Sequence, residues 1–237
     1  MSEIFKDELK KLRIHFVEMG INVNEQIYRA TKAFISHDES LADQVLDLDR
    51  QINDQEVTLE KQALKLMALQ QPLANDFRLI ISILKASNDI ERLGDYASHI
   101  ARSTKHVDAQ QVDADVDQAI DQLTTKIRQM LEKVLDAFVN DNERAAYEVA
   151  EQDLAVDVVH VQQQKQILQK MTANQATIPS YEAYLAVLRN LERAGDHIVN
   201  LAEWVVYIQT GKLVELNPGK TDPKLVKEAL AKAKSKD

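Results

Sequence analysis

Two short stretches of this chain, 101 positions apart, have nearly the same sequence. Residues 90–95 read IERLGD and residues 191–196 read LERAGD. Residues 49–53 (DRQIN) and 153–157 (DLAVD) form a second related pair, 104 positions apart. An internal repeat constrains the architecture of a chain strongly, because each copy folds as one supersecondary unit. The sequence therefore predicts two copies of a unit that is about 100 residues long.

The chain is also poor in the residues that make turns. Its 237 residues include five glycines and four prolines, where average usage gives roughly sixteen and twelve. A β-sandwich or β-barrel needs a turn every ~8–12 residues, so we exclude these folds. The chain has no cysteine, which excludes disulfides, thiolate metal sites and cysteine nucleophiles and suits a reducing cytosol.

Each copy is predicted to form three long helices. The predicted helices are residues 3–35, 38–70 and 73–104 in the first copy and 113–139, 142–172 and 179–210 in the second. Prolines after Gln71 and Ile178 mark the matching second turns, and Gly211 suits the end of the last helix. Ser36 and Asn140, each followed three residues later by a glutamate, are predicted to cap the second and fifth helices.

The predicted fold is all-α, with two tandem three-helix bundles. Residues 1–104 form the first bundle, 105–112 a linker, 113–211 the second bundle, and 212–237 a Lys-rich tail with a weak helix at about 222–235. The net charge is −9, with 29 Lys and Arg against 38 Asp and Glu, which argues against nucleic acid as a ligand. The mixed-charge N-terminal segment is not expected to be a signal peptide, and no apolar run approaches the ~18 residues of a membrane-spanning helix.

Both copies place carboxylates where a bundle expects apolar side chains. The heptad positions of the third and sixth predicted helices are apolar or small apart from Glu91 and Glu192. Asp95 and Asp196 follow four residues later, on the same side of each helix. The acidic or amide residues on or beside the stripes of the second and fifth helices are Asp49, Asn53, Glu56, Glu60, Asp153 and Asp157. Each bundle is therefore expected to bring acidic residues of two helices towards one another.

Two interpretations of these carboxylates compete. In the first, they form ordinary surface ion pairs with neighbouring cations, which are Arg92, Arg193, Arg50 and Lys61. In the second, carboxylates four residues apart on facing helices form all-oxygen sites for divalent or ferric ions. The seam position, the duplication and a glycine inside each helix favour metal binding. The metal itself stays open among Fe, Zn, Mn and Mg.

No catalytic constellation is visible in the sequence. The chain has no Glu-x-x-His motif of the kind that ferritin-like di-iron centres use. It also has no P-loop, no GxGxxG and nothing like a nucleophile elbow. We therefore expect a protein that is not an enzyme. Two alternatives stay open: a metal-dependent phosphohydrolase that uses the same carboxylates, and a helical metal buffer.

Two longer segments closely resemble the hallmark segments of the PhoU family. They are residues 189–207 (RNLERAGDHIVNLAEWVVY) and residues 64–79 (LKLMALQQPLANDFRL), the latter followed by ERLGD at 91–95. The similarity covers residues from about 5 to 212, which is essentially both repeats. The resemblance implies two tandem three-helix bundles with repeated E(D)xxxD motifs that bind metal clusters.

The resemblance also implies a phosphate-signalling adaptor. PhoU proteins associate with a Pst-type phosphate importer through its ATPase subunit, and with a PhoR-type sensor histidine kinase. When phosphate is plentiful, they keep the kinase from activating its response regulator and restrain phosphate uptake. They commonly form homodimers and work at the cytoplasmic face of the membrane, which they reach only through their partners. A cytoplasmic negative regulator of phosphate transport and phosphate homeostasis is therefore expected.

Metal ligands are expected at the positions that match the motifs of the family. Six of these positions are Glu91, Asp95, Asp153, Asp157, Glu192 and Asp196. Asp49 also matches, but Asn53 stands where an aspartate is usual, which removes a charge and leaves a carbonyl ligand. Glu56 or Glu60 is expected to compensate in the first bundle. At the positions that match Glu56 and Glu60, the second bundle has His160 and Gln164. The two sites are therefore expected to differ in metal and affinity.

Overall fold

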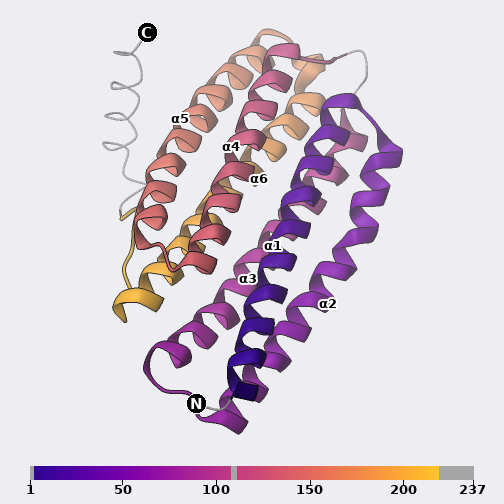
Figure 1. Ribbon diagram of the computed structural model, residues 1–237. Coiled ribbons are helices and arrows are strands. Elements are labelled where there is room, and N and C mark those ends of the chain that lie inside the picture. The colour runs from indigo at the N-terminus through magenta and orange to yellow at the C-terminus, as the bar shows by residue number, and fades with distance from the viewer. Residues whose placement is uncertain (1–2, 108–110, 219–237) are drawn as a thin grey trace.

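The computed structural model describes residues 3–107 and 111–218, which form six long helices (Figure 1). The helices are α1 (Glu3–Ser36), α2 (Glu39–Gln70), α3 (Ala74–Ser103), α4 (Ala114–Asn140), α5 (Glu143–Ala173) and α6 (Ile178–Thr210). Short 3₁₀ turns at Thr104–His106 and Gln175–Thr177 follow α3 and α5, and these described ranges contain no strand. The all-α prediction is confirmed, with every helix boundary within one residue of its predicted place. The helix predicted at 222–235 lies outside the described residues.

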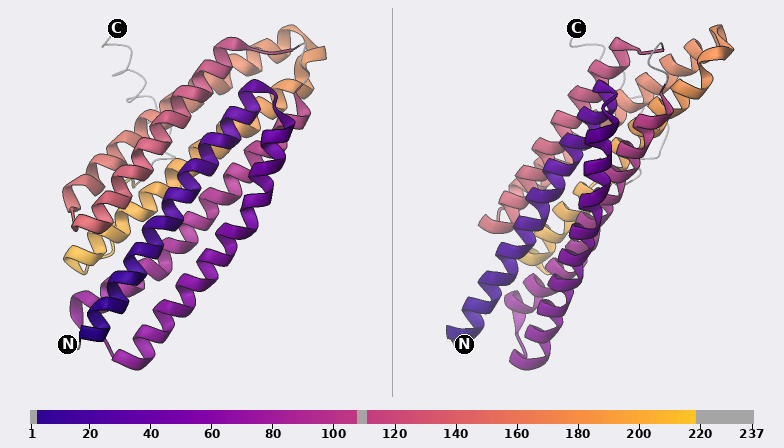
Figure 2. Two further views of the ribbon diagram at one scale, coloured as in Figure 1. Left: turned by 45° about the vertical axis from the view of Figure 1, so that its right-hand side comes forward. Right: turned by 90° about the vertical axis from the view of Figure 1, so that its right-hand side faces the viewer.

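The helices pack as two three-helix bundles that lie side by side (Figures 1 and 2). α3 packs along α6 and α1 packs along α4, so these four helices form the centre of the molecule. α2 contacts α1 and α3, whereas α5 contacts α4 and α6, and the two lie at opposite edges. The α2/α3 and α5/α6 contacts are therefore two separate helix–helix interfaces. Across the part of the chain that the structure describes, no helix is long and apolar enough to cross a membrane.

Aromatic contacts between the bundles join their interiors into one core. The rings of Phe16 and Phe138 are 4.7 Å apart, and those of Phe34 and Tyr184 are 5.1 Å apart in an edge-on arrangement. All four side chains are completely buried. Such ring pairs contribute about 0.5–1.5 kcal/mol each beyond the burial of their area. Because each pair joins one repeat to the other, the two bundles are held together by packing as well as by the chain.

The predicted caps of α2 and α5 are wrong by two residues in both copies. Asp38 caps α2 and Asn142 caps α5, and each side chain accepts a hydrogen bond from the N–H three residues on, at 2.9 and 3.2 Å. Ser36 and Asn140 are instead the last residues of α1 and α4. One left-handed residue, with φ of 53° or 52°, separates helix end and cap in each copy. Because the chain needs this extra residue to reverse direction, the cap lies two residues after the end of the preceding helix.

Asp113 ties the start of α4 to α5 and α6. Its Oδ1 accepts a hydrogen bond from the N–H of Val116 at 3.4 Å, and its Oδ2 accepts one from the hydroxyl of Tyr181 at 2.7 Å. Oδ2 also pairs with Lys170, and the backbone N–H of Asp113 donates to Tyr184 Oη at 3.2 Å. Burial alone raises the pKa of Asp113, but the hydrogen bonds from Lys170 and Tyr181 outweigh it and hold the pKa below its usual value.

Replacement of Asp113 tests this junction. Asp113→Ala removes a cap and two charged hydrogen bonds, so the free energy of unfolding should fall by about 2 kcal/mol at pH 7. Asp113→Asn keeps the cap, so its free energy of unfolding should fall by less than that of Asp113→Ala. The difference in free energy of unfolding between wild type and Asp113→Asn should become smaller as the pH falls below 3.8. The reason is that the stabilisation by a carboxylate with a lowered pKa is lost on protonation. Urea denaturation measures these values, with exposed Asp115→Ala as the control.

Candidate functional site

The structure brings acidic residues of α2 and α3 together in the first bundle. We call Asp49, Glu56, Glu91 and Asp95 the first seam. Burial raises the pKa of Glu91, and the negative charges of Asp95, Glu56 and Asp49 raise it further. Asn88 and Ser98 of α3 donate hydrogen bonds to Glu56 and Asp49 of α2, so the α2 carboxylates of this seam face α3.

Glu56 experiences the same excess of negative charge. Burial raises its pKa, a hydrogen bond from Asn88 Nδ2 at 3.4 Å lowers it, and the charge of Glu60 raises it again. Both glutamates of the first seam are therefore less readily ionised than a solvated carboxyl group. A bound cation would relieve this repulsion.

Arg92 forms the surface ion pairs that the first interpretation expected. Its Nη1 is 3.0 Å from Asp95 Oδ2 and its Nε is 3.9 Å from Glu91 Oε2. The Arg92 side chain is 52% exposed, so solvent screens these pairs and each contributes little. The two interpretations therefore both describe part of the first seam: one arginine pairs with it, and it still carries an excess of negative charge.

A buried polar group lies under the first seam. Ser98 Oγ donates to Asp49 Oδ1 at 2.8 Å, and Gln26 Nε2 donates to Ser98 Oγ at 3.4 Å. Gln26 is 1% exposed, and its Oε1 is buried with no hydrogen-bond partner among the described residues. A Cβ at Gly94 would lie 3.3 Å from that oxygen. The glycine thus leaves room for an amide beside the carboxylates.

The second seam has the same motif residues in a different setting. We give this name to Asp153, Asp157, Glu192 and Asp196. Asp153 is completely buried, and its Oδ1 lies so close to Gly195 that a Cβ there would overlap it. Asn217, which follows α6, donates from Nδ2 to Asp153 Oδ2 at 3.2 Å. Asp157, Glu192 and Asp196 are half-buried on the facing sides of α5 and α6.

Other expected ligands lie at the edge of the seams. Asn53 and Glu60 are exposed on α2, and Glu60 is near enough to raise the pKa of Glu56. As the side chains stand, no three Asp, Glu or His residues in the described ranges converge on one point that could hold a metal ion. Sequence reasoning overlooked Gln26 and Asn217. Gln26 could have been noticed as a polar residue on the apolar face of α1, but Asn217 lies outside the repeats and gave no signal.

The donor set of the first seam nevertheless suits a hard cation. Its ligands would be carboxylate oxygens, which Mg²⁺, Mn²⁺ and Fe ions accept. The unpartnered Gln26 Oε1 and the space beside Gly94 add a carbonyl oxygen under the carboxylates. The residues present therefore fit a cation bound through oxygen, provided the carboxylates draw together around it.

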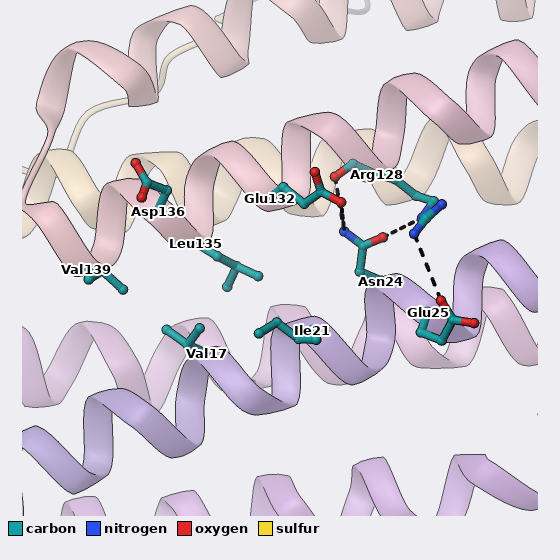
Figure 3. A pocket seen from close by; sticks show the side chains of 9 residues that line it. All are labelled: Val17, Ile21, Asn24, Glu25, Arg128, Glu132, Leu135, Asp136 and Val139. Carbon is teal, nitrogen blue, oxygen red and sulfur yellow. Dashed lines mark hydrogen bonds and ion pairs between the residues drawn. The ribbon is translucent and has the colours of Figure 1, made fainter.

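A separate groove lies between α1 and α4 (Figure 3). It has a volume of 390 Å³, and its lining residues are Val17, Ile21, Asn24, Glu25, Arg128, Glu132, Leu135, Asp136 and Val139. Arg128 Nε donates to Asn24 Oδ1 at 2.6 Å and closes one end of the groove. Because this groove lies between α1 and α4, it is distinct from both seams.

The fold and the seams define a class of protein: a tandem pair of three-helix bundles, each with acidic motifs on its second and third helices. The sequence model of the family described as the PhoU domain matches residues 16–104 and 120–205. These two matches cover both repeats. The chain belongs to the PhoU family.

Individual relatives align over most of their length. The "Phosphate-specific transport system accessory protein PhoU homolog" of Clostridium acetobutylicum is 33% identical over 91% of this chain and 98% of that protein. The corresponding PhoU protein of Escherichia coli is 31% identical over 88% of this chain and 86% of its own. The crystal structure of PhoU from Pseudomonas aeruginosa superposes with a TM-score of 0.81 at 33% identity, covering 88% of this chain and all of that one. The PhoU structure from Streptococcus pneumoniae gives 0.84 at 30% identity, over 89% of this chain and 99% of that one.

The two seam glycines should respond differently to a methyl group. Gly195→Ala forces the buried Asp153 carboxylate to move, so it should lower the free energy of unfolding by about 1–3 kcal/mol. Gly94→Ala meets Gln26 and Ile52 at 3.3 Å, and its gain of about 1 kcal/mol in helix propensity should nearly offset that contact. Urea denaturation of both variants measures the difference. Equal effects would contradict the tight contact at Gly195.

Neutralising one glutamate should stabilise the metal-free protein. Glu91→Gln removes a like charge, which should raise the free energy of unfolding by about 0.5–1 kcal/mol at pH 7 in chelator. Because the pKa of Glu91 is raised in the folded protein, its charge does not destabilise the fold below the pKa of the unfolded chain, 4.5. The destabilisation is complete above the folded pKa. The advantage of the variant should therefore disappear as the pH falls towards 4.5. Glu182→Gln, at an exposed position of α6, is the matched control.

Proposed function

We propose that this protein regulates phosphate uptake and phosphate-starvation signalling, as a negative regulator that acts when phosphate is plentiful. The observation that carries the proposal is the family match across both repeats. Relatives that are 31–33% identical over about nine-tenths of the chain are named as accessory proteins of the phosphate-specific transport system. A match of that extent supports a shared role better than any single motif does.

The protein would act as an adaptor between two partners. In this proposal it joins the ATPase subunit of a Pst-type phosphate importer to a PhoR-type sensor histidine kinase in the cytoplasm, and it forms a homodimer. Exposed apolar residues support a role in protein contacts. Tyr147, Leu154 and Leu168 are 45%, 42% and 51% exposed on α5, and their spacing in multiples of seven puts them on one face of the helix.

The two seams would bind cations in the adaptor. Asp49, Glu56, Glu91 and Asp95 would hold one in the first bundle, with Asn53 and Glu60 at its edge. Asp153, Asp157, Glu192 and Asp196 would hold another in the second. A divalent or iron-type ion there would neutralise the acidic surface and cross-link neighbouring helices. The excess negative charge on the first seam supports this part of the proposal.

Binding to the importer ATPase tests the adaptor role. The ATPase subunit of the same organism is immobilised, and the full-length protein is passed over it in Mn²⁺. Wild type should bind, and Glu192→Ala/Asp196→Ala should bind at least about tenfold more weakly. Asp7→Ala/Asp121→Ala removes two exposed acidic residues outside the seams and should bind like wild type.

Two further measurements separate the parts of this proposal. A deletion strain should express phosphate-starvation genes in high phosphate, and the wild-type gene should restore repression. Equal ATPase binding by wild type and the seam variant would remove the cation-dependent part while leaving the adaptor role. Turnover of p-nitrophenyl phosphate by Mn²⁺-loaded protein, lost in the seam variant, would instead favour the phosphohydrolase.

A further inference from the structure

Large apolar side chains are exposed at one end of the first bundle. Across the described ranges, the four most exposed are Leu73, Leu213, Ile4 and Leu69, at 81%, 74%, 70% and 67%. Three of them belong to the start of α1, the end of α2 and the connection from α2 to α3, which lie at the same end of the molecule (Figure 1). We call residues 3–11 and 61–77 the tip. Single exposed leucines are ordinary, but a group of them marks an interaction site.

The tip projects beyond the second bundle. Arg13 of α1 donates from Nη1 to Val139 O at 2.8 Å, next to the end of α4. Arg78 of α3 donates from Nε to Ile208 O at 3.0 Å, near the end of α6. The ten residues of α1 before Arg13 therefore extend about 15 Å past α4, as both views in Figure 2 show. The tip is a convex end that a flat surface can reach.

Apolar side chains from different elements of the tip lie close together. Ile4 and Leu69 line one groove between α1 and α2, which has a volume of 410 Å³. Leu73 directly precedes α3, and Phe77, which is 42% exposed, follows one turn later. The tip therefore presents a shared apolar surface to which α1, α2 and α3 all contribute.

An exposed leucine at position 73 does not stabilise the fold. Leu73 is the N-cap residue of α3, where Ser, Thr, Asp or Asn would accept a hydrogen bond, and its side chain makes none. The neighbouring Gln71 and Ala74 are both left-handed, with φ of 44° and 49°, and this conformation costs free energy in residues other than glycine. The connection therefore presents Leu73 to the outside at a cost in stability.

The equivalent connection of the second repeat is polar. Asn174 stands 101 positions after Leu73, and Ala173 stands 104 positions after Leu69. Asn174 caps the 3₁₀ turn after α5, because its Oδ1 accepts a hydrogen bond from the N–H of Ala176 at 3.1 Å. The same arrangement of helices thus forms with a small residue and a capping residue at these positions. A contact outside the bundle accounts for the two leucines better than folding does.

The charges of the tip favour a lipid surface over a protein. The tip contains five lysines and four acidic residues, in a chain whose net charge is −9. Lys11 and Lys65 line the same groove as Ile4 and Leu69. Lysine is depleted from protein–protein interfaces. At a membrane, by contrast, its stem lies along apolar groups while its ammonium group meets anionic headgroups.

We propose that the tip binds directly to the surface of an anionic membrane. Ile4, Leu69, Leu73 and Phe77 enter the headgroup region to a depth of about 5–10 Å, and the lysines stay among the lipid phosphates. Burial of the apolar side chains supplies affinity, and the lysines add electrostatic attraction. The family resemblance implied membrane contact only through protein partners. The tip adds a second attachment, which does not depend on the proposed adaptor role.

Sedimentation of the full-length protein with lipid vesicles tests this inference. Wild type should bind vesicles of phosphatidylglycerol and phosphatidylethanolamine, and it should bind phosphatidylcholine vesicles more weakly. Leu69→Ser/Leu73→Ser should bind the anionic vesicles at least about tenfold more weakly, and it should fold because serine can cap α3. Ile21→Ser/Val57→Ser removes two exposed apolar side chains from the middle of α1 and α2, and it should bind like wild type.

A fluorophore at a single cysteine shows which part of the protein enters the lipid. The chain has no cysteine of its own, so the label can be attached to Gln70→Cys, beside Leu69, or to Gln175→Cys in the equivalent connection of the second repeat. Anionic vesicles should shift the emission to shorter wavelength only for the label at position 70. No shift at position 70, or an equal shift at both positions, would contradict insertion of the tip.

The remaining outcomes separate the tip from other contacts. Absence of vesicle binding by wild type would overturn the inference. Equal vesicle binding by wild type and Leu69→Ser/Leu73→Ser would also overturn it, and would assign the binding to another segment such as the Lys-rich residues 212–237. If the protein ignores vesicles while Leu69→Ser/Leu73→Ser loses binding to the importer ATPase, the tip is a protein contact instead. None of these vesicle results decides the adaptor role, which the ATPase measurement tests separately.

Discussion

The packing of α3 against α6 is the contact on which the remaining arrangement depends. Tyr96 and His197 occupy equivalent positions, 101 residues apart, and meet where the two helices cross: their rings are 5.5 Å apart and Tyr96 Oη is 3.1 Å from His197 Nε2. His197 Nδ1 is also 2.8 Å from Asp89 Oδ1. The repeats therefore meet through equivalent turns, and Asp95 and Asp196 directly precede these two residues in the chain. Each motif then faces the outer helix of its own bundle.

Much of this fold was predictable, because long helices joined by few turns can pack together in only a few ways. Scarce glycine and proline, together with the repeat, gave six helices with boundaries correct to one residue. The caps of α2 and α5 were misplaced, because Ser36 and Asn140 fit a capping pattern as well as Asp38 and Asn142 do. Only the left-handed residue at each reversal decides between them, and no local pattern in the sequence specifies that conformation for His37 or Asp141.

The candidate site was predictable in its motif residues and not in their surroundings. Heptad spacing identified Glu91, Asp95, Glu192 and Asp196, because position on a helix face follows from residue number alone. The groups that support the aspartates come from elsewhere. Gln26 reaches the first seam from α1, and Asn217 reaches the second from beyond α6. Such contacts depend on tertiary packing, and a single sequence contains no period that reports them.

Environment, rather than motif, therefore decides what each acidic pair can do. Asp49 and Asp153 occupy the same place in the repeat, yet one is half-buried beside a hydroxyl group and the other is fully buried beneath an amide. The two motifs also have different buried neighbours, since Val199 stands 101 positions after Ser98. In the second repeat, Asn217 from outside the repeat donates one hydrogen bond to the buried carboxylate. This contact and the bond from Asn217 to Ala150 O connect the segment after α6 to α5 and to the second seam.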